Sequence, residues 1–232
     1  RQTNSGVNFS GGSEKGNFFV STNYNNLKGI VDNSNFKSGN LNANLYQNLS
    51  DRLKMNLRLG AFYGKGQFAQ DGNRVGGNRS FIAGVSLFNP LIDSGDDGFD
   101  TDLGLSSPYT WVNDFQDVSE EQRFIGNFSL IYNLGIKGLK YKIQAGGNIR
   151  DKTRDRFYGP TTFQGSTQNG FLQSTSINTK SYQINNLLMY SRRFSKKHRI
   201  NAVLGTTYDV RHKLFTRACL LYTSPSPRDV EE

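Results

Sequence analysis

The sequence lacks any long hydrophobic run. Its 232 residues contain no apolar stretch of the ~18 residues that a transmembrane helix requires. A helical membrane protein is therefore excluded. The mean hydropathy of −0.60 does not exclude a membrane β-barrel, because each strand of such a barrel gives only alternate residues to the lipid, while its lumen, turns and loops stay polar.

Cysteine, histidine and proline are also scarce, with one Cys, two His and five Pro against 25 Gly. Two isolated imidazoles give no support to a metal site or a catalytic pair. The sequence contains no G-x-S-x-G frame that would present a serine nucleophile. The composition favours strands and turns over helices. We therefore expect neither an enzyme nor a bound cofactor.

The one cysteine, Cys219, opens a C-terminal segment of foreign character. Residues 219–229 read like the in-frame translation of a transposon adapter used in preparing sequencing libraries. We therefore expect residues 219–232 to be an unstructured artefact, and the natural protein to continue differently after residue 218. Without this tail the chain has no cysteine, which suits an envelope protein. No signal peptide begins at Arg1, so we expect an internal fragment of a longer protein.

The clearest structural signal is a pair of alternating runs, residues 41–49 and 53–63, joined by a short polar link. A period of two predicts strands with one apolar face, and the short link predicts an antiparallel hairpin. Runs of roughly ten residues can cross a bilayer as tilted strands. The apolar positions of the second run are Leu53, Met55, Leu57, Leu59, Ala61 and Tyr63.

Similar alternation recurs along the chain. Strands are expected before residue 28, over 124–134 and 139–149 as a second hairpin, and over 182–190 and 200–210 around a basic turn at 194–198. Residues 64–120 and 151–180 are predicted to be long polar loops. Short and long connections thus alternate, as in outer-membrane barrels. A complete small barrel of about eight strands is an alternative, although such barrels rarely carry a loop of this length.

The net charge of +9 would also suit a nucleic-acid binder. The basic residues form no single cluster, however, and recur inside predicted strands, where Lys54 and Arg58 occupy the polar face. A barrel lumen lined by polar and basic side chains explains this distribution better. We therefore expect outer-membrane lipid as a partner, and no nucleic acid.

Several motifs resemble SusC/RagA-type TonB-linked outer-membrane receptors. Residues 10–21 read SGGSEKGNFFVS, close to the family form S-G-G-x-E-K-x-x-Y-F-V-S, and residues 29–37 read GIVDNSNFK, close to G-I-V-x-N-S-x-F. Phe18 stands at a position that is commonly Tyr in this pattern. Weaker matches follow in the family's order: Asn89-Pro90-Leu91-Ile92, Arg123 with Asn127, Tyr158-Gly159-Pro160 and Lys197-His198.

The resemblance covers residues 1–218 and implies an all-β fold, an antiparallel transmembrane barrel of about twenty-two strands of which this chain would hold about eight. It implies a location in the outer membrane, with long extracellular loops. It also implies import of oligosaccharides or peptides, a SusD-like surface lipoprotein as partner, and energy from TonB, which would contact a region upstream of this chain. A passive porin and a surface adhesin barrel are the alternatives.

Two sets of loop residues are candidate sites. An acidic stretch within residues 93–102 offers enough oxygen ligands for Ca²⁺, but it lacks the glutamate that closes a calcium loop, so a solvated acidic loop is the alternative. Its carboxylates are Asp93, Asp96, Asp97, Asp100 and Asp102. Loop aromatics could stack on a ligand or pack inward within the loops. They are Tyr109, Trp111, Phe115, Tyr158 and Phe163.

Overall fold

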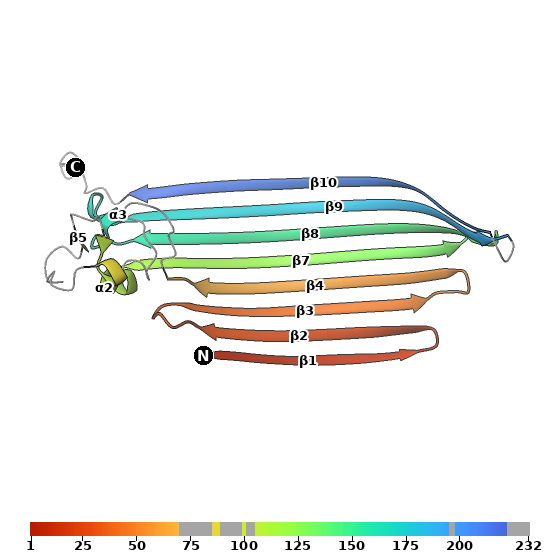
Figure 1. Cartoon of the computed structure of the whole chain (residues 1–232), viewed down its shortest axis with the longest axis horizontal. Coiled ribbons are helices and arrows are strands. Elements are labelled where there is room, and N and C mark those ends of the chain that lie inside the picture. Colours follow the sequence, from red (N-terminus) through yellow and green to blue (C-terminus); the bar gives the residue numbers. More distant parts are fainter. Residues whose placement is uncertain (70–84, 89–98, 101–104, 195–197, 222–232) are drawn as a thin grey trace, which may run out of the picture.

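The computed structural model describes residues 1–69, 85–88, 99–100, 105–194 and 198–221. Eight of its strands form one antiparallel sheet, in which each strand pairs with the next along the chain (Figure 1). The strands in sheet order are β1 (Gln2–Ser13), β2 (Gly16–Lys28), β3 (Asn35–Asn48), β4 (Leu53–Gln67), β7 (Phe115–Asn133), β8 (Leu139–Tyr158), β9 (Phe171–Arg193) and β10 (Arg199–Leu221). The predicted all-β barrel segment is confirmed at the level of strand order.

Short elements occupy one end of the sheet. The strands β5 (Phe99–Asp100) and β6 (Leu105–Ser106) pair with each other, and the helices α2 (Pro108–Asn113) and α3 (Phe163–Ser166) follow them along the chain. Figure 1 shows these elements gathered beyond the ends of β7–β9. Among the described residues, no helix is both long enough and apolar enough to cross a membrane.

The register sorts the side chains into two faces. One row across the sheet is apolar at nearly every strand, because the pairing aligns the predicted apolar positions of neighbouring strands. This row reads Phe18, Leu45, Leu57, Phe128, Ala145, Ile184 and Tyr208. The next row lies on the opposite face and, from β3 to β10, reads Asn44, Arg58, Asn127, Gly146, Gln183 and Asp209, with Phe19 as its β2 member.

These two faces are called the apolar face and the polar face below. Large hydrophobic side chains on the apolar face remain exposed, with Leu204 at 73% and Val7 at 68%. A sheet in water would cover such a face with a second layer. In a transmembrane barrel the lipid covers it, and the polar face lines the lumen. This assignment explains why so few hydrophobic residues of the described chain are buried.

The connections differ at the two ends of the sheet (Figure 1). One end, called the turn end, carries the short turns 14–15, 49–52, 134–138 and 194–198, of which 195–197 lie outside the described residues. The other end, called the loop end, carries the connections 29–34, 68–114 and 159–170. The predicted alternation of short and long connections is confirmed. In outer-membrane barrels the loop end is extracellular.

The predicted limits of both long loops are wrong. The strand β4 continues to Gln67 and β7 begins at Phe115, so the first loop is shorter than residues 64–120. The strands β8 and β9 reach Tyr158 and Phe171, so the second loop is 159–170 and not 151–180. Beyond the apolar band both faces of a strand become polar, and the alternation disappears although the backbone pairing continues.

The C-terminal tail, residues 219–232, also differs from what the sequence predicted. Cys219, Leu220 and Leu221 belong to β10, where they pair with Gln173, Leu172 and Phe171. The expectation that the chain is unstructured from Cys219 onward is therefore wrong for these residues. Backbone pairing with β9 can extend through them because ladder hydrogen bonds do not depend on side-chain identity. Residues 222–232 lie outside the described part of the chain.

Candidate functional site

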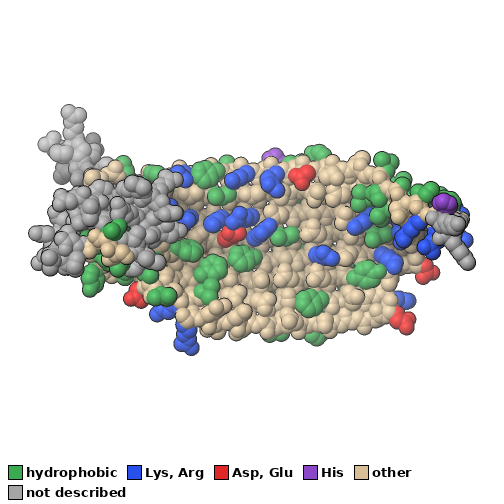
Figure 2. All heavy atoms as spheres, in the orientation of Figure 1, with side chains coloured by type: hydrophobic (Ala, Val, Ile, Leu, Met, Phe, Trp, Pro, Cys, Tyr) green, Lys and Arg blue, Asp and Glu red, His purple; other side chains and the backbone are tan. Residues whose placement is uncertain are grey.

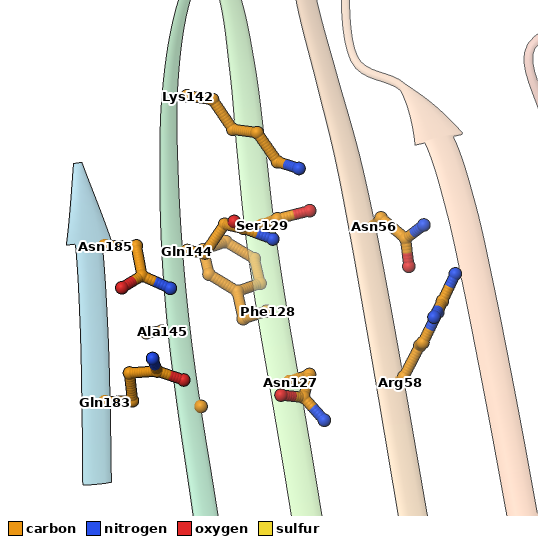
Figure 3. Close-up of a pocket in the computed structure, with 11 residues that line it drawn as sticks. Asn56, Arg58, Asn127, Phe128, Ser129, Lys142, Gln144, Ala145, Gln183 and Asn185 are labelled. Carbon is orange, nitrogen blue, oxygen red and sulfur yellow. The ribbon is translucent and has the colours of Figure 1, made fainter. Parts of the chain in front are cut away.

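The middle of the polar face carries a shallow cavity of about 420 Å³. Figure 3 shows polar side chains of β4, β7, β8 and β9 around it. The polar side chains of its lining are Asn56, Arg58, Asn127, Ser129, Lys142, Gln144, Gln183 and Asn185. Within the described residues, the buried side-chain oxygen of Asn185 has no hydrogen-bond partner. The wall therefore offers amide, hydroxyl and cationic groups that can bind a polar solute or water.

An ion-pair cluster lies farther along the polar face, toward the loop end. Asp117 on β7 is 1% exposed and accepts hydrogen bonds from Nε and Nη2 of Arg154 at 2.7 and 2.5 Å. Its Oδ2 also accepts from Nε of Arg156 at 3.1 Å. The register explains this meeting, because Asp117 pairs with Arg156 and Ser119 pairs with Arg154. Two guanidinium groups thus compensate one buried carboxylate.

A second ion pair follows on the same two strands. Nε and Nη2 of Arg150 donate to the two carboxylate oxygens of Glu121 at 2.7 and 2.8 Å. Both residues lie just beyond the apolar alternation that ends at Phe124 and Ile149. Hydrogen bonding to Arg150 lowers the pKa of the Glu121 carboxyl, against the opposing effect of desolvation, and the same contact raises the pKa of Arg150. Both groups therefore stay charged at neutral pH.

An aromatic cluster lies at the loop end of the sheet, beyond the ion pairs. Trp111 of α2 is 5% exposed and makes edge-to-face contacts with Phe115 at 5.2 Å and Tyr158 at 6.4 Å between ring centroids. Phe171 stacks on Tyr158 at 5.4 Å. Phe115 and Tyr158 meet because they are partners in the β7–β8 ladder. This small cluster is the hydrophobic core of the described residues.

Polar contacts join the two long loops beside this cluster. Asp114, at the C-cap of α2, accepts hydrogen bonds from the backbone nitrogen and Oγ1 of Thr161 at 2.9 and 2.7 Å. Its backbone oxygen accepts from Gly159 at 2.8 Å. A Cβ at Gly159 would overlap the Asp114 carboxylate, so this close approach requires glycine. The side chain of Asn33 donates to the carbonyl of Val112 and joins α2 to the loop 29–34.

The aromatic candidates from the sequence are divided by the structure. Trp111, Phe115 and Tyr158 come together, buried against one another, which corresponds to the inward-packing alternative. Tyr109 is 73% exposed, so its ring is accessible to a ligand. Phe163 lies in α3, but its side chain is outside the described residues. A ligand contact by any of these residues stays a prediction.

The calcium candidate falls almost wholly outside the described residues. Asp93, Asp96, Asp97 and Asp102 are not described, and of Asp100 only its place in β5 is. Among the residues that the structure describes, no three His, Cys, Asp or Glu side chains come together in a way that could hold a metal ion. Calcium binding by the acidic stretch therefore stays a prediction.

Sequence reasoning missed the ion-pair cluster because its residues fall inside the predicted long loops. One signal could have revealed it, since basic residues occupy every second position after Ile149. This run continues the period of the strand that precedes it and marks one face of a longer strand. The basic residues are Arg150, Lys152, Arg154 and Arg156.

Comparisons with known proteins place this site in context. No family model matches the chain. Two curated proteins of Formosa agariphila are similar to it: TonB-dependent receptor P3, 25% identical over 220 residues, and TonB-dependent receptor P26, 26% identical over 214 residues. The alignments cover 89% and 88% of this chain and 21% of each relative, so the chain spans about a fifth of their length.

Solved structures show the same fold. The RagAB peptide transporter superposes with a TM-score of 0.75 and 20% identity over 94% of this chain and 25% of that chain. The RagAB peptide importer in its closed-closed state gives 0.70 and 19% over 95% and 28% of the two chains. FpvA of P. aeruginosa, bound to a pyoverdine–iron complex, gives 0.61 and 15% over 97% and 28%.

The chain is a segment of a transmembrane β-barrel of the outer membrane. More particularly, its sequence and its fold are similar to those of TonB-dependent receptors, and the resemblance to SusC/RagA-type receptors is confirmed. The proteins that it resembles are named receptors, transporters and importers, and not enzymes. In barrels of this fold the polar face of the sheet lines the lumen.

Proposed function

We propose that this chain forms part of the wall of a receptor that imports oligosaccharides or peptides, energised through TonB and assisted by a SusD-like surface lipoprotein. The observation that carries the proposal is the polar face. Hydrogen-bonding side chains line it from the cavity at Arg58 and Asn127 to the ion pairs at Glu121 and Asp117. A solute that moves through the lumen would exchange its hydration for these groups step by step.

The loop end of the sheet supports the idea that this receptor recognises its substrate. Specificity in a rigid barrel falls to the connections above it. Here two of the connections are fixed against each other, through the Asp114–Thr161 hydrogen bonds and the buried rings of Trp111 and Tyr158. Connections that are fixed in this way can hold exposed side chains, such as Tyr109, in position to contact a ligand. The similarity to the RagAB peptide transporter supports peptides as one of the two substrate classes.

Gene deletion in the organism that carries the full-length receptor tests this proposal. We expect loss of the receptor gene to abolish growth on one oligosaccharide or peptide source, supplied as the sole nutrient of its kind. Loss of the gene for the SusD-like lipoprotein should reduce growth on that same source. Restoring the full-length receptor should restore growth. Unchanged growth on every source after receptor deletion would overturn import, and would favour a surface adhesin.

A further inference from the structure

A second cavity lies on the polar face near the loop end, apart from the central cavity at Arg58 and Asn127. Its volume is about 240 Å³, and its floor is formed by β9 between walls from β8 and β10. It is lined by Lys152, Arg154, Arg156, Gln173, Thr175, Ile177, Phe215 and Arg217. Figure 2 shows Lys and Arg side chains gathered over the loop-end half of these strands.

The lining of this cavity is strongly cationic. It includes four Lys or Arg side chains and no carboxylate. Arg154 and Arg156 are both tied to the neighbouring carboxylate of Asp117. Within the described residues, Lys152 and Arg217 have no carboxylate within ion-pair distance. The cavity therefore keeps a positive charge that its own side chains do not neutralise.

The register gives the cavity a shape suited to an anionic group. Arg154, Thr175 and Arg217 lie in one row across β8, β9 and β10, so the two arginines stand about 10 Å apart at their backbones, with a short hydroxyl side chain between them. The guanidinium of Arg217 lies over the ring of Phe215, 5.4 Å from its centroid. This contact restricts the arginine and leaves its outer N–H groups available.

We propose that this cavity binds a carboxylate group carried by the substrate. Planar guanidinium groups recognise carboxylates through paired hydrogen bonds, and the amide of Gln173 and hydroxyl of Thr175 add further donors. Ile177 and Phe215 offer an apolar side for the ring or chain that bears the carboxylate. This inference rests on the proposed import function and narrows its substrates to acidic oligomers.

Two double variants of the full-length receptor test the assignment. The test variant is Lys152→Gln with Arg217→Gln, which leaves the two partners of Asp117 in place. The control is Lys140→Gln with Arg199→Gln, which removes the same charges from the same two strands at the turn end. The probes are tetraglutamate and tetragalacturonate, each compared with a neutral counterpart, tetraglutamine and the methyl-esterified sugar.

Equilibrium binding to the purified full-length receptor is the measurement. We expect at least one acidic probe to bind more tightly than its neutral counterpart, and the test variant to bind that probe roughly tenfold or more weakly, as expected for lost charge-assisted hydrogen bonds. The control variant should bind it like wild type. Whether the peptide or the sugar is preferred identifies the carrier of the carboxylate.

Three results would overturn the assignment: no preference for acidic probes, unchanged binding by the test variant, or an equal loss in the control variant. The proposed function fails differently. If receptor deletion leaves uptake of every substrate intact, import itself is refuted. If uptake depends on the receptor but shows no preference for carboxylates, only the present inference is refuted.

Discussion

Asp117, near the loop end of the sheet, is a buried charged residue. Its side chain is almost wholly buried between Arg154 and Arg156, whereas in the neighbouring pair the side chains of Glu121 and Arg150 are 22% and 40% exposed. Removing one partner of a buried pair costs about 3–5 kcal/mol because a charge is left uncompensated. An exposed pair contributes only about 0–1 kcal/mol. The Asp117 cluster and the Glu121–Arg150 pair should therefore differ widely in their contribution to stability.

We predict that Asp117→Asn lowers the free energy of unfolding of the full-length barrel by about 3 kcal/mol. The matched change Glu121→Gln should lower it by at most about 1 kcal/mol, because water already screens that pair. Urea unfolding of the barrel refolded in lipid vesicles measures both values. Equal losses for the two variants would contradict the burial that the structure assigns to Asp117.

Individual residues also show what sequence can and cannot predict. The aromatic character of Trp111, Phe115 and Tyr158 was visible in the sequence, but their mutual contact was not. Phe115 meets Tyr158 only because β7 and β8 pair in one particular register, 43 positions apart along the chain. Spacing in the sequence does not record such long-range contacts. The basic alternation from Arg150 to Arg156 was a local signal that could have been read as a strand.

At the scale of elements, the alternation of apolar and polar residues along each strand determines the fold. Leu57 on β4 lies between Leu45 and Phe128 of the adjacent strands, all on the apolar face. Arg58, one position farther, lies between Asn44 and Asn127 on the polar face and borders the central cavity. A single step along the chain therefore moves a side chain from lipid to lumen.

We expect Leu57→Arg to hinder assembly of the full-length receptor in the membrane by ~2–4 kcal/mol if it lies near the bilayer midplane. The matched change Arg58→Leu should be mild, because it places an apolar side chain in a wide polar lumen. Heat-modifiable migration of the folded barrel on gels measures the folded fraction of each. If both changes have the same effect, the assignment of the faces is wrong.

The positions at which the strands end were harder to predict than the existence of the strands. The turns at the turn end were found because alternation stops there at polar residues on both sides, as at residues 50–52. At the loop end the strands continue beyond the apolar band. The strands β7, β8 and β9 have 19, 20 and 23 residues, about twice the length that a bilayer requires. Their outer halves keep backbone pairing without the hydrophobic pattern that sequence analysis uses.

At the scale of the whole described chain, the eight long strands form a single sheet, and the stability of this sheet depends on its surroundings. The buried hydrophobic side chains of the described residues belong to one small cluster at the loop end. A single exposed sheet cannot offset its conformational entropy by burial in water. Lipid on one face supplies that burial, and the polar face is left for a solute. The sequence predicted this division of the faces, but it held no information on the identity of the solute whose import we propose.

Uptake with and without TonB tests the central claim of energy-coupled import most directly. The measurement is the initial rate at which cells accumulate a labelled form of the substrate that receptor deletion identifies. We predict that cells lacking TonB still bind this substrate at their surface but do not accumulate it, like cells that lack the receptor. Accumulation at an undiminished rate without TonB would contradict the account and identify the barrel as a passive porin.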